Sequence, residues 1–353
     1  MINMEGHSMV EYDTLSDVLA LGDTLAYLYD GDGRGLTAYR LSTGDVAWHA
    51  PMPDSNTGGQ GQGTWAPRLA GTAVVGTFGT STAGVGTSAG RHAITVVAYD
   101  ATTGRQRWST QFAQGDGTDQ TLGAPRVVAA DDAHVLVSVA QEGYSSTPPM
   151  SALLDARTGA VIWTDPDFNG IALAKTVAAG TTQDENEFVG KAVSDGHQVW
   201  NRTVGIGDLI TKPLGPALIW VNAISGDPTN MLLDPATGKT RLSLDHSVQQ
   251  CQYDGWATVV CSGDSVVAVD VSTGRVLWRL PDQATNRIAP QKVGSVWHGV
   301  IYAETSNPMT LDAQTGKDIR TDIGTDPSMV NDHYGLVYDD QAAPSVEVYR
   351  AIS

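Results

Sequence analysis

Residues able to do chemistry are few and scattered along this chain of 353 residues. Its eight histidines show neither an HxH nor an HxxxH spacing, the arrangements that place two zinc ligands side by side. No serine stands in the strand–turn–helix context of a nucleophile elbow, and the Gly-rich GTSTAG stretch lacks that context as well. The histidines and serines therefore predict neither a zinc centre nor a hydrolase triad.

One pair of carboxylates has a spacing that resembles a calcium loop. Asp30 and Asp32 lie in YDGDGRG, but Arg34 stands where the third ligand is needed and no suitable Glu follows. A polar turn between strands explains this stretch better. The acidic run TTQDENEF is interpreted as a solvated loop tip. We therefore expect no metal site and no bound cofactor.

The two cysteines carry more information. Cys251 and Cys261 are ten residues apart in CQYDGWATVVCSGD. A turn at Asp254 and Gly255 would make the flanking strands antiparallel and bring the two cysteines to bridging distance. The spacing alone does not fix the register, so two buried free thiols are the alternative. A disulfide would indicate an oxidising, extracytoplasmic location.

A repeated signature positions all of these residues. It consists of an apolar strand, a Thr-Gly turn and, in most copies, a Trp four residues after the Gly. The glycines recur 36 to 60 residues apart, the length of one four-stranded propeller blade. Thr-Gly copies occur at Gly44, Gly104, Gly159, Gly238, Gly274 and Gly316, with tryptophans at Trp48, Trp108, Trp163 and Trp278. A weaker copy combines Gly196 with Trp200.

The residue types in each copy of the repeat have simple physical roles. Glycine adopts the positive φ that a tight turn requires, and alternating residues such as Val267, Val269 and Val271 indicate a half-buried strand. The tryptophan is expected to bury its ring between neighbouring blades, with its indole N–H finding an acceptor. The repeat tryptophans and glycines are thus interpreted as structural, and a tryptophan ligand box is the alternative.

The ends of the chain indicate how the ring closes. The C-terminal stretches GLVYDD and VEVYRAIS predict the second and third strands of a blade that lacks its outer strand. We expect residues 10–14 to supply that strand beside residues 346–350, which removes the open sheet edges. The prediction is an all-β, eight-bladed propeller formed by residues 10–353, with a seven-bladed ring as the alternative. Residues 1–9 are interpreted as a cloning remnant or a disordered segment.

The pattern AxDxxTGxxxW resembles the repeat of PQQ-type β-propellers over essentially the whole chain, from about Asp17 onward. That family includes quinoprotein alcohol dehydrogenases, BamB-type lipoproteins of outer-membrane assembly and other bacterial envelope proteins. The resemblance implies the fold firmly and the function weakly, because propellers host many unrelated activities. In the quinoprotein enzymes, PQQ lies between a Trp and a disulfide of adjacent cysteines, beside calcium. This chain has no adjacent cysteines and lacks the long catalytic insertions, so we expect no enzyme activity.

Composition narrows the classes of partner. The net charge of −18 argues against nucleic acids and anionic membrane surfaces. No run of eighteen apolar residues would span a bilayer, and the first residues lack the apolar core of a signal peptide. Any membrane attachment is expected to come from an anchor outside this sequence.

Insertions between the predicted strands favour one side of the ring as the binding side. With the strands of a blade labelled A to D from the channel outward, all long insertions fall in B–C or D–A connections, which share one side. Loops on a rigid scaffold commonly carry function. The predicted contacts are residue types that dominate interfaces: Trp65, Arg68, Arg91, His92 and Tyr144. Blade-to-blade packing is the alternative for Trp65 and Arg68, and a solvated loop for Tyr144.

The function expected from these features is a non-catalytic, extracytoplasmic binding or scaffolding propeller that recognises a protein or a wall component. The alternative is the sensor domain of a larger membrane receptor, such as a serine/threonine kinase. A PQQ-dependent dehydrogenase is the third hypothesis, and the missing adjacent cysteines argue against it.

Overall fold

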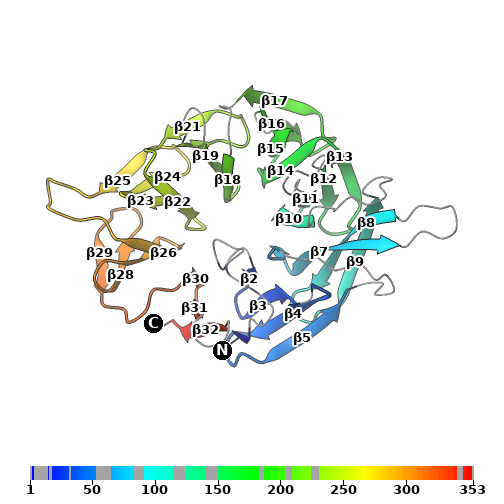
Figure 1. The fold of residues 1–353 in the computed structure, drawn as a ribbon, viewed down its shortest axis with the longest axis horizontal. Helices are drawn as coiled ribbons and strands as arrows, with labels where there is room; N and C mark the ends of the chain where they lie inside the picture. The colour runs from blue at the N-terminus through cyan, green and yellow to red at the C-terminus, as the bar shows by residue number, and fades with distance from the viewer. Residues whose placement is uncertain are drawn as a thin grey trace.

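Four-stranded antiparallel sheets are arranged as a ring in the computed structural model (Figure 1), and the innermost strands of several of them line a central channel. The structure describes residues 2–3, 15, 18–31, 33–52, 65–82, 91–113, 125–139, 150–182, 187–203, 209–223, 230–339 and 345–351. Eight such sheets are present among these residues, which confirms the predicted eight-bladed propeller. None of the described residues belongs to a helix long and apolar enough to cross a bilayer.

The first four blades follow each other along the chain, and each runs outward from the channel. Blade 1 contains β2 (Leu19–Leu21), β3 (Leu25–Tyr29), β4 (Gly35–Arg40) and β5 (Val46–Pro51). Blade 2 contains β6 (Arg68–Ala70), β7 (Ala73–Thr82), β8 (Arg91–Asp100) and β9 (Gln106–Ala113). Blade 3 contains β10 (Pro125–Ala130), β11 (His134–Val139), β12 (Met150–Asp155) and β13 (Val161–Asp165). Blade 4 contains β14 (Phe168–Leu173), β15 (Val177–Thr182), β16 (Glu187–Ala192) and β17 (Gln198–Thr203).

Blades 5 to 7 repeat this order, and blade 8 combines both ends of the chain. Blade 5 contains β18 (Leu209–Leu214), β19 (Leu218–Ala223), β20 (Asn230–Leu233) and β21 (Thr240–Ser243). Blade 6 contains β22 (Val248–Tyr253), β23 (Thr258–Gly263), β24 (Val266–Asp270) and β25 (Val276–Leu280). Blade 7 contains β26 (Lys292–Trp297), β27 (Val300–Glu304), β28 (Pro308–Asp312) and β29 (Asp318–Thr321). Blade 8 contains β30 (Met329–Val330), β31 (Tyr334–Asp339), β32 (Ser345–Arg350) and β1 (Ile2–Asn3).

An N-terminal strand closes the ring, but it is not the strand predicted. Ile2 and Asn3 of β1 pair with Val346 and Ser345 of β32, and both chain ends lie beside β32 in Figure 1. Residues 10–14, which were predicted for this place, lie outside the described residues. The position beside Val346 belongs to Ile2, whose fully buried side chain packs in the core between blades 8 and 1. Two residues of the segment interpreted as a remnant or disordered thus belong to the eighth blade.

The repeat tryptophans join neighbouring blades, as predicted. The ring of Trp48 in blade 1 lies against Gly104, in the Thr-Gly turn of blade 2, so closely that a Cβ there would be 2.6 Å from the ring. Its indole N–H donates to the carbonyl of Ala101 in the same turn, at 2.9 Å. Trp108 makes the corresponding hydrogen bond to Ala156 of blade 3, and Trp278 bonds to Ala313 of blade 7. The indole N–H groups of Trp163 and Trp200 are buried without a hydrogen-bond partner among the described residues.

An aspartate opens most of the Thr-Gly turns and stabilises them. In blade 2, Oδ1 of Asp100 accepts hydrogen bonds from the backbone N–H groups of Thr102 and Thr103 and from the Thr103 hydroxyl. Hydrogen bonds from Arg107 and Thr103 lower the pKa of Asp100 to about 2. Gly104 has a φ of +70°, where a side chain is strained. The Thr-Gly turns that begin with an aspartate are therefore stabilised by local hydrogen bonds.

The apolar core is divided among the spaces between blades. One cluster combines blades 2 and 3, where Val96 and Trp108 pack with Val135 and Leu154. Another combines blades 8 and 1, and it includes Ile2. Because each blade buries apolar residues on both of its faces, a blade is stable only between its neighbours. The result is a rigid ring that presents two different sides.

Candidate functional site

Sheet topology divides the connections into two groups. Since neighbouring strands in a blade are antiparallel, the B–C and D–A connections leave from one side of the ring. We call this the loop side. The A–B and C–D turns leave from the opposite side, which we call the turn side. The predicted insertions fall between strands on the loop side and lie mostly outside the described residues.

Two predicted contact residues stand at the loop-side end of blade 2. Arg91 and His92 begin β8 and pair with Thr82 and Ser81 of β7. The β7–β8 hairpin is longer than the other B–C pairs, so it carries these two positions past the body of the blade. Tyr144 lies outside the described residues. These three positions remain predicted contacts.

Trp65 and Arg68 lie at the inner end of blade 2. The guanidinium of Arg126, from β10 of blade 3, lies 5.2 Å from the centre of the Trp65 ring. Such a cation–π contact stabilises the join between two blades. Arg68 is the first residue of β6 and lines the central cavity. Trp65 thus contributes at least to blade packing, whereas Arg68 belongs to the channel.

The central channel contains a cavity of about 750 Å³. The innermost strands of blades 1, 2, 5, 6, 7 and 8 line it. Its charged lining residues among those described are all cationic: Arg68, Lys212 and Lys292. Gln250, Gln252 and Ser295 add polar groups. A cavity of this size is within the range of small-molecule sites.

The cation of Lys292 belongs to an ion pair. Lys292 Nζ lies 3.0 Å from Oδ2 of Asp326, whose side chain is only 6% exposed. Burial raises the pKa of Asp326, and the ammonium of Lys292 opposes that rise. The carboxylate packs over Gly294, where a side chain would collide with it. This pair joins the innermost strand of blade 7 to the segment that leads into blade 8.

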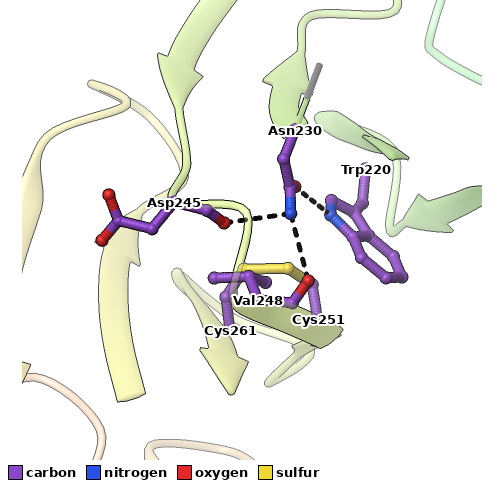
Figure 2. The surroundings of a disulfide bond; sticks show 6 residues. All are labelled: Trp220, Asn230, Asp245, Val248, Cys251 and Cys261. Carbon is purple, nitrogen blue, oxygen red and sulfur yellow. Dashed lines mark hydrogen bonds between the residues drawn. A yellow bond between two sulfur atoms is a disulfide. The ribbon is translucent and has the colours of Figure 1, made fainter. Parts of the chain in front are cut away.

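Cys251 and Cys261 form a disulfide, and the turn between them lies where the sequence placed it. The two residues are direct cross-strand partners in β22 and β23, and both are fully buried. Figure 2 shows a buried hydrogen-bond network beside them. Asn230 accepts a hydrogen bond from the indole of Trp220 at 2.7 Å and donates to the carbonyls of Asp245 and Val248. The bridge is therefore a structural part of the core between blades 5 and 6.

The carboxylate of Asp30 has partners within the blade. Its Oδ1 accepts from the hydroxyl of Thr37 at 2.6 Å, and its Oδ2 lies 2.8 Å from Nε2 of His49. Asp32 lies outside the described residues. No group of three potential metal ligands occurs in the described parts of the chain. Asp30 thus acts as a hydrogen-bonding partner in blade 1.

The residues present do not fit PQQ. The disulfide joins two neighbouring strands rather than adjacent residues, and its sulfurs are buried in the core. Among the described residues that line the channel, none has a carboxylate able to hold calcium. The described lining of the channel thus does not match the features that the resemblance associates with a quinoprotein active site.

Comparison with known proteins decides the family. The family model described as outer membrane protein assembly factor BamB matches residues 8–202 and 189–349. The chain belongs to this BamB-type family. No curated protein matches the sequence.

Two of the solved structures that match this chain are a BamB protein and a WD40 domain. BamB from Moraxella catarrhalis is 17% identical, with a TM-score of 0.49, over 93% of this chain and 95% of that chain. The C-terminal WD40 domain of Sif2 is 10% identical, with a TM-score of 0.47, over 84% and 82%. The assignment to the BamB-type family rests on the family model.

The sequence interpretation missed an aromatic group on the turn side. Trp256, Trp297 and His298 stack on one another although they come from two blades. A signal was available in the repeat itself. Five of the nine tryptophans occupy the position four residues after a turn glycine, and neither Trp256 nor Trp297 does. A tryptophan outside the repeat position needs a separate explanation.

Proposed function

We propose that this BamB-type propeller is a non-catalytic, extracytoplasmic scaffold that binds a protein partner through its loop side. The observation that carries the proposal is the match of the family model, whose description names an assembly factor, along residues 8–349. Scaffolding also agrees with the channel, which lacks the adjacent cysteines and, among the described lining residues, the carboxylates of a quinoprotein site.

Two features support the details of the proposal. The buried disulfide is typical of proteins that fold in an oxidising compartment, so it favours a location outside the cytoplasm. The predicted insertions fall between strands on the loop side. There the paired strands β7 and β8 hold Arg91 and His92 in place. Arg91, His92 and Tyr144 are the proposed anchors at this side.

Affinity capture from envelope extracts of the native organism tests the proposal. The double variant Arg91→Ala/Tyr144→Ala removes two anchors and is expected to lose the captured protein while keeping the unfolding midpoint. Arg157→Ala/Arg275→Ala is the matched control, since both of its residues are exposed on turn-side C–D turns. Loss of capture in the control, with capture intact in the first variant, would place the interface on the turn side instead.

A further inference from the structure

Three aromatic rings form a continuous stack at the turn-side mouth of the channel. Trp256 lies in the A–B turn of blade 6, Trp297 ends β26, and His298 follows it in the A–B turn of blade 7. The imidazole lies 4.2 Å from the Trp256 ring at 11° and 4.0 Å from the Trp297 ring at 26°. We call this group the Trp-His-Trp stack. Trp297 also lines the central cavity, and β22, β26 and β30 are neighbours around the channel (Figure 1).

Hydrogen bonds from three blades fix the stack. Asp332, in the A–B turn of blade 8, uses Oδ1 to accept the indole N–H of Trp297 at 2.9 Å and lies 2.8 Å from Nδ1 of His298. The backbone N–H of His298 donates to the carbonyl of Asp254 at 2.7 Å. Asp254 also accepts the backbone N–H of Trp256 at 2.8 Å. The stack is thus held in place before any partner arrives, which lowers the entropic cost of binding.

Trp256 differs from the repeat tryptophans in its exposure. It is 64% exposed, whereas Trp48, Trp108 and Trp163 are 7–8% exposed. The imidazole of His298 stacks against one of its faces. A large ring in water on a rigid support is typical of an interface anchor, because covering it gains apolar burial at little cost in ordering.

The charge of Asp332 indicates what kind of partner would cover Trp256. The Asp332 side chain is 62% exposed, and its Oδ1 takes both hydrogen bonds, so Oδ2 makes none among the described residues. The indole of Trp297 and the imidazole of His298 lower the pKa of Asp332, which keeps the carboxylate ionised. The charged residues described in the adjoining cavity lining are cationic, so the negative charge that the stack offers to a partner is that of Asp332. A cationic partner suits both features, since an ammonium or guanidinium is attracted to an indole face and to a carboxylate.

The geometry suits two basic side chains rather than one. Trp256 stacks on His298, whereas Asp332 is bonded to Trp297 and His298, so the exposed indole and the carboxylate are two separate positions for a cation. Basic residues two positions apart on an extended segment are about 7 Å apart, which allows one to cover the indole and the other to reach the carboxylate.

We propose that the Trp-His-Trp stack and Asp332 form a binding site for an extended basic segment of a partner protein. This site lies on the turn side and the site of the proposed function lies on the loop side, so either can fail without the other. A scaffold with both sites would hold two partners on opposite sides of one ring.

Fluorescence anisotropy with a labelled peptide, acetyl-Gly-Arg-Gly-Arg-Gly-amide, tests the site on the full chain at low salt. The comparison peptide replaces both arginines by citrulline, which keeps the shape and removes the charge. We expect the arginine peptide to bind and the citrulline peptide to bind about tenfold or more weakly, the size of one cation–π or charge contact. Equal binding of the two peptides, or no binding of the arginine peptide, would overturn the proposal.

Variants identify the residues involved. Trp256→Ala is expected to weaken the arginine peptide about tenfold, while Trp256→Phe retains part of the affinity. Asp332→Asn is expected to weaken it and to reduce its salt dependence. Ile288→Ala is the control, because Ile288 is 72% exposed and lies in the D–A connection on the loop side. Unchanged binding in Trp256→Ala would refute the site.

Two further measurements separate the other possible occupants. If maltohexaose displaces the arginine peptide, the stack would be a carbohydrate-binding site instead. If analytical sedimentation detects a dimer that dissociates in the Trp256→Ala variant, the stack would be occupied by a second copy of this chain. Each of these outcomes counts against the basic-segment proposal.

Discussion

In the ring, each repeat tryptophan packs against the turn glycine of the next blade. Replacing Gly104 by alanine tests this contact. The new Cβ would lie 2.6 Å from Cδ2 of Trp48, about 1 Å inside a normal carbon–carbon contact. The φ of +70° adds the strain of a side chain in a left-handed conformation, about 1–2 kcal/mol. Displacing a packed ring costs a further 1–3 kcal/mol or so. The expected loss in unfolding free energy is therefore about 2–5 kcal/mol.

Gly299→Ala is the matched control. Gly299 has a φ of +84°, but no atom lies within 4 Å of the place its Cβ would take. This variant should therefore lose only the conformational part, about 1–2 kcal/mol. Urea denaturation followed by circular dichroism gives both values, and a Trp48→Leu background should reduce the difference between them. Equal losses in the two glycine variants would refute the reasoning.

Three further predictions concern stability. Replacing Cys251 and Cys261 together by alanine should cost about 2–3 kcal/mol in denaturant, from the loop that the bridge closes, and alkylation with mass spectrometry should find no thiol in the unreduced protein. Ile2→Asp should lower the thermal midpoint by several degrees, because it places a charge in the fully buried core position of the closing strand; an unchanged midpoint would show that β1 contributes nothing to closure. The lowered pKa of Asp100 stabilises the fold above the ordinary carboxyl pKa, and this contribution is lost as the pH falls to about 2. The difference in thermal midpoint between wild type and Asp100→Asn should accordingly shrink between about pH 5 and pH 2.

The blades could be predicted because their determinants are local and repeated. Each turn glycine and the tryptophan four residues later belong to one hairpin, so spacing alone locates them. The cysteine pair could be predicted for the same reason, since the turn at Asp254 and Gly255 sets the register of one hairpin. The strand that closes the ring could not be predicted in the same way. Two paired residues, Ile2 and Asn3, are too short for any periodic pattern.

The candidate sites were predictable only in part because they depend on contacts between blades. Trp65 was identified by residue type, but its contact with Arg126 joins positions far apart in the sequence. The Trp-His-Trp stack joins Trp256 to His298 across two blades. Such a contact follows from the angle between sheets, which no spacing in the sequence encodes. The loop-side anchors were chosen by position and residue type, and they remain predictions.

Site-specific photocrosslinking tests the central claim, that the loop side binds a protein partner. A photoreactive phenylalanine derivative replaces Tyr144 on the loop side or, as the control, the exposed Thr102 in the C–D turn of blade 2. Thr102 lies in blade 2, whereas the Trp-His-Trp stack belongs to blades 6 and 7, so the proposed turn-side site does not interfere. Irradiation of intact envelopes of the native organism should give a protein adduct from position 144 and none from position 102. Adducts from position 102 alone, or no adduct from position 144, would contradict the account.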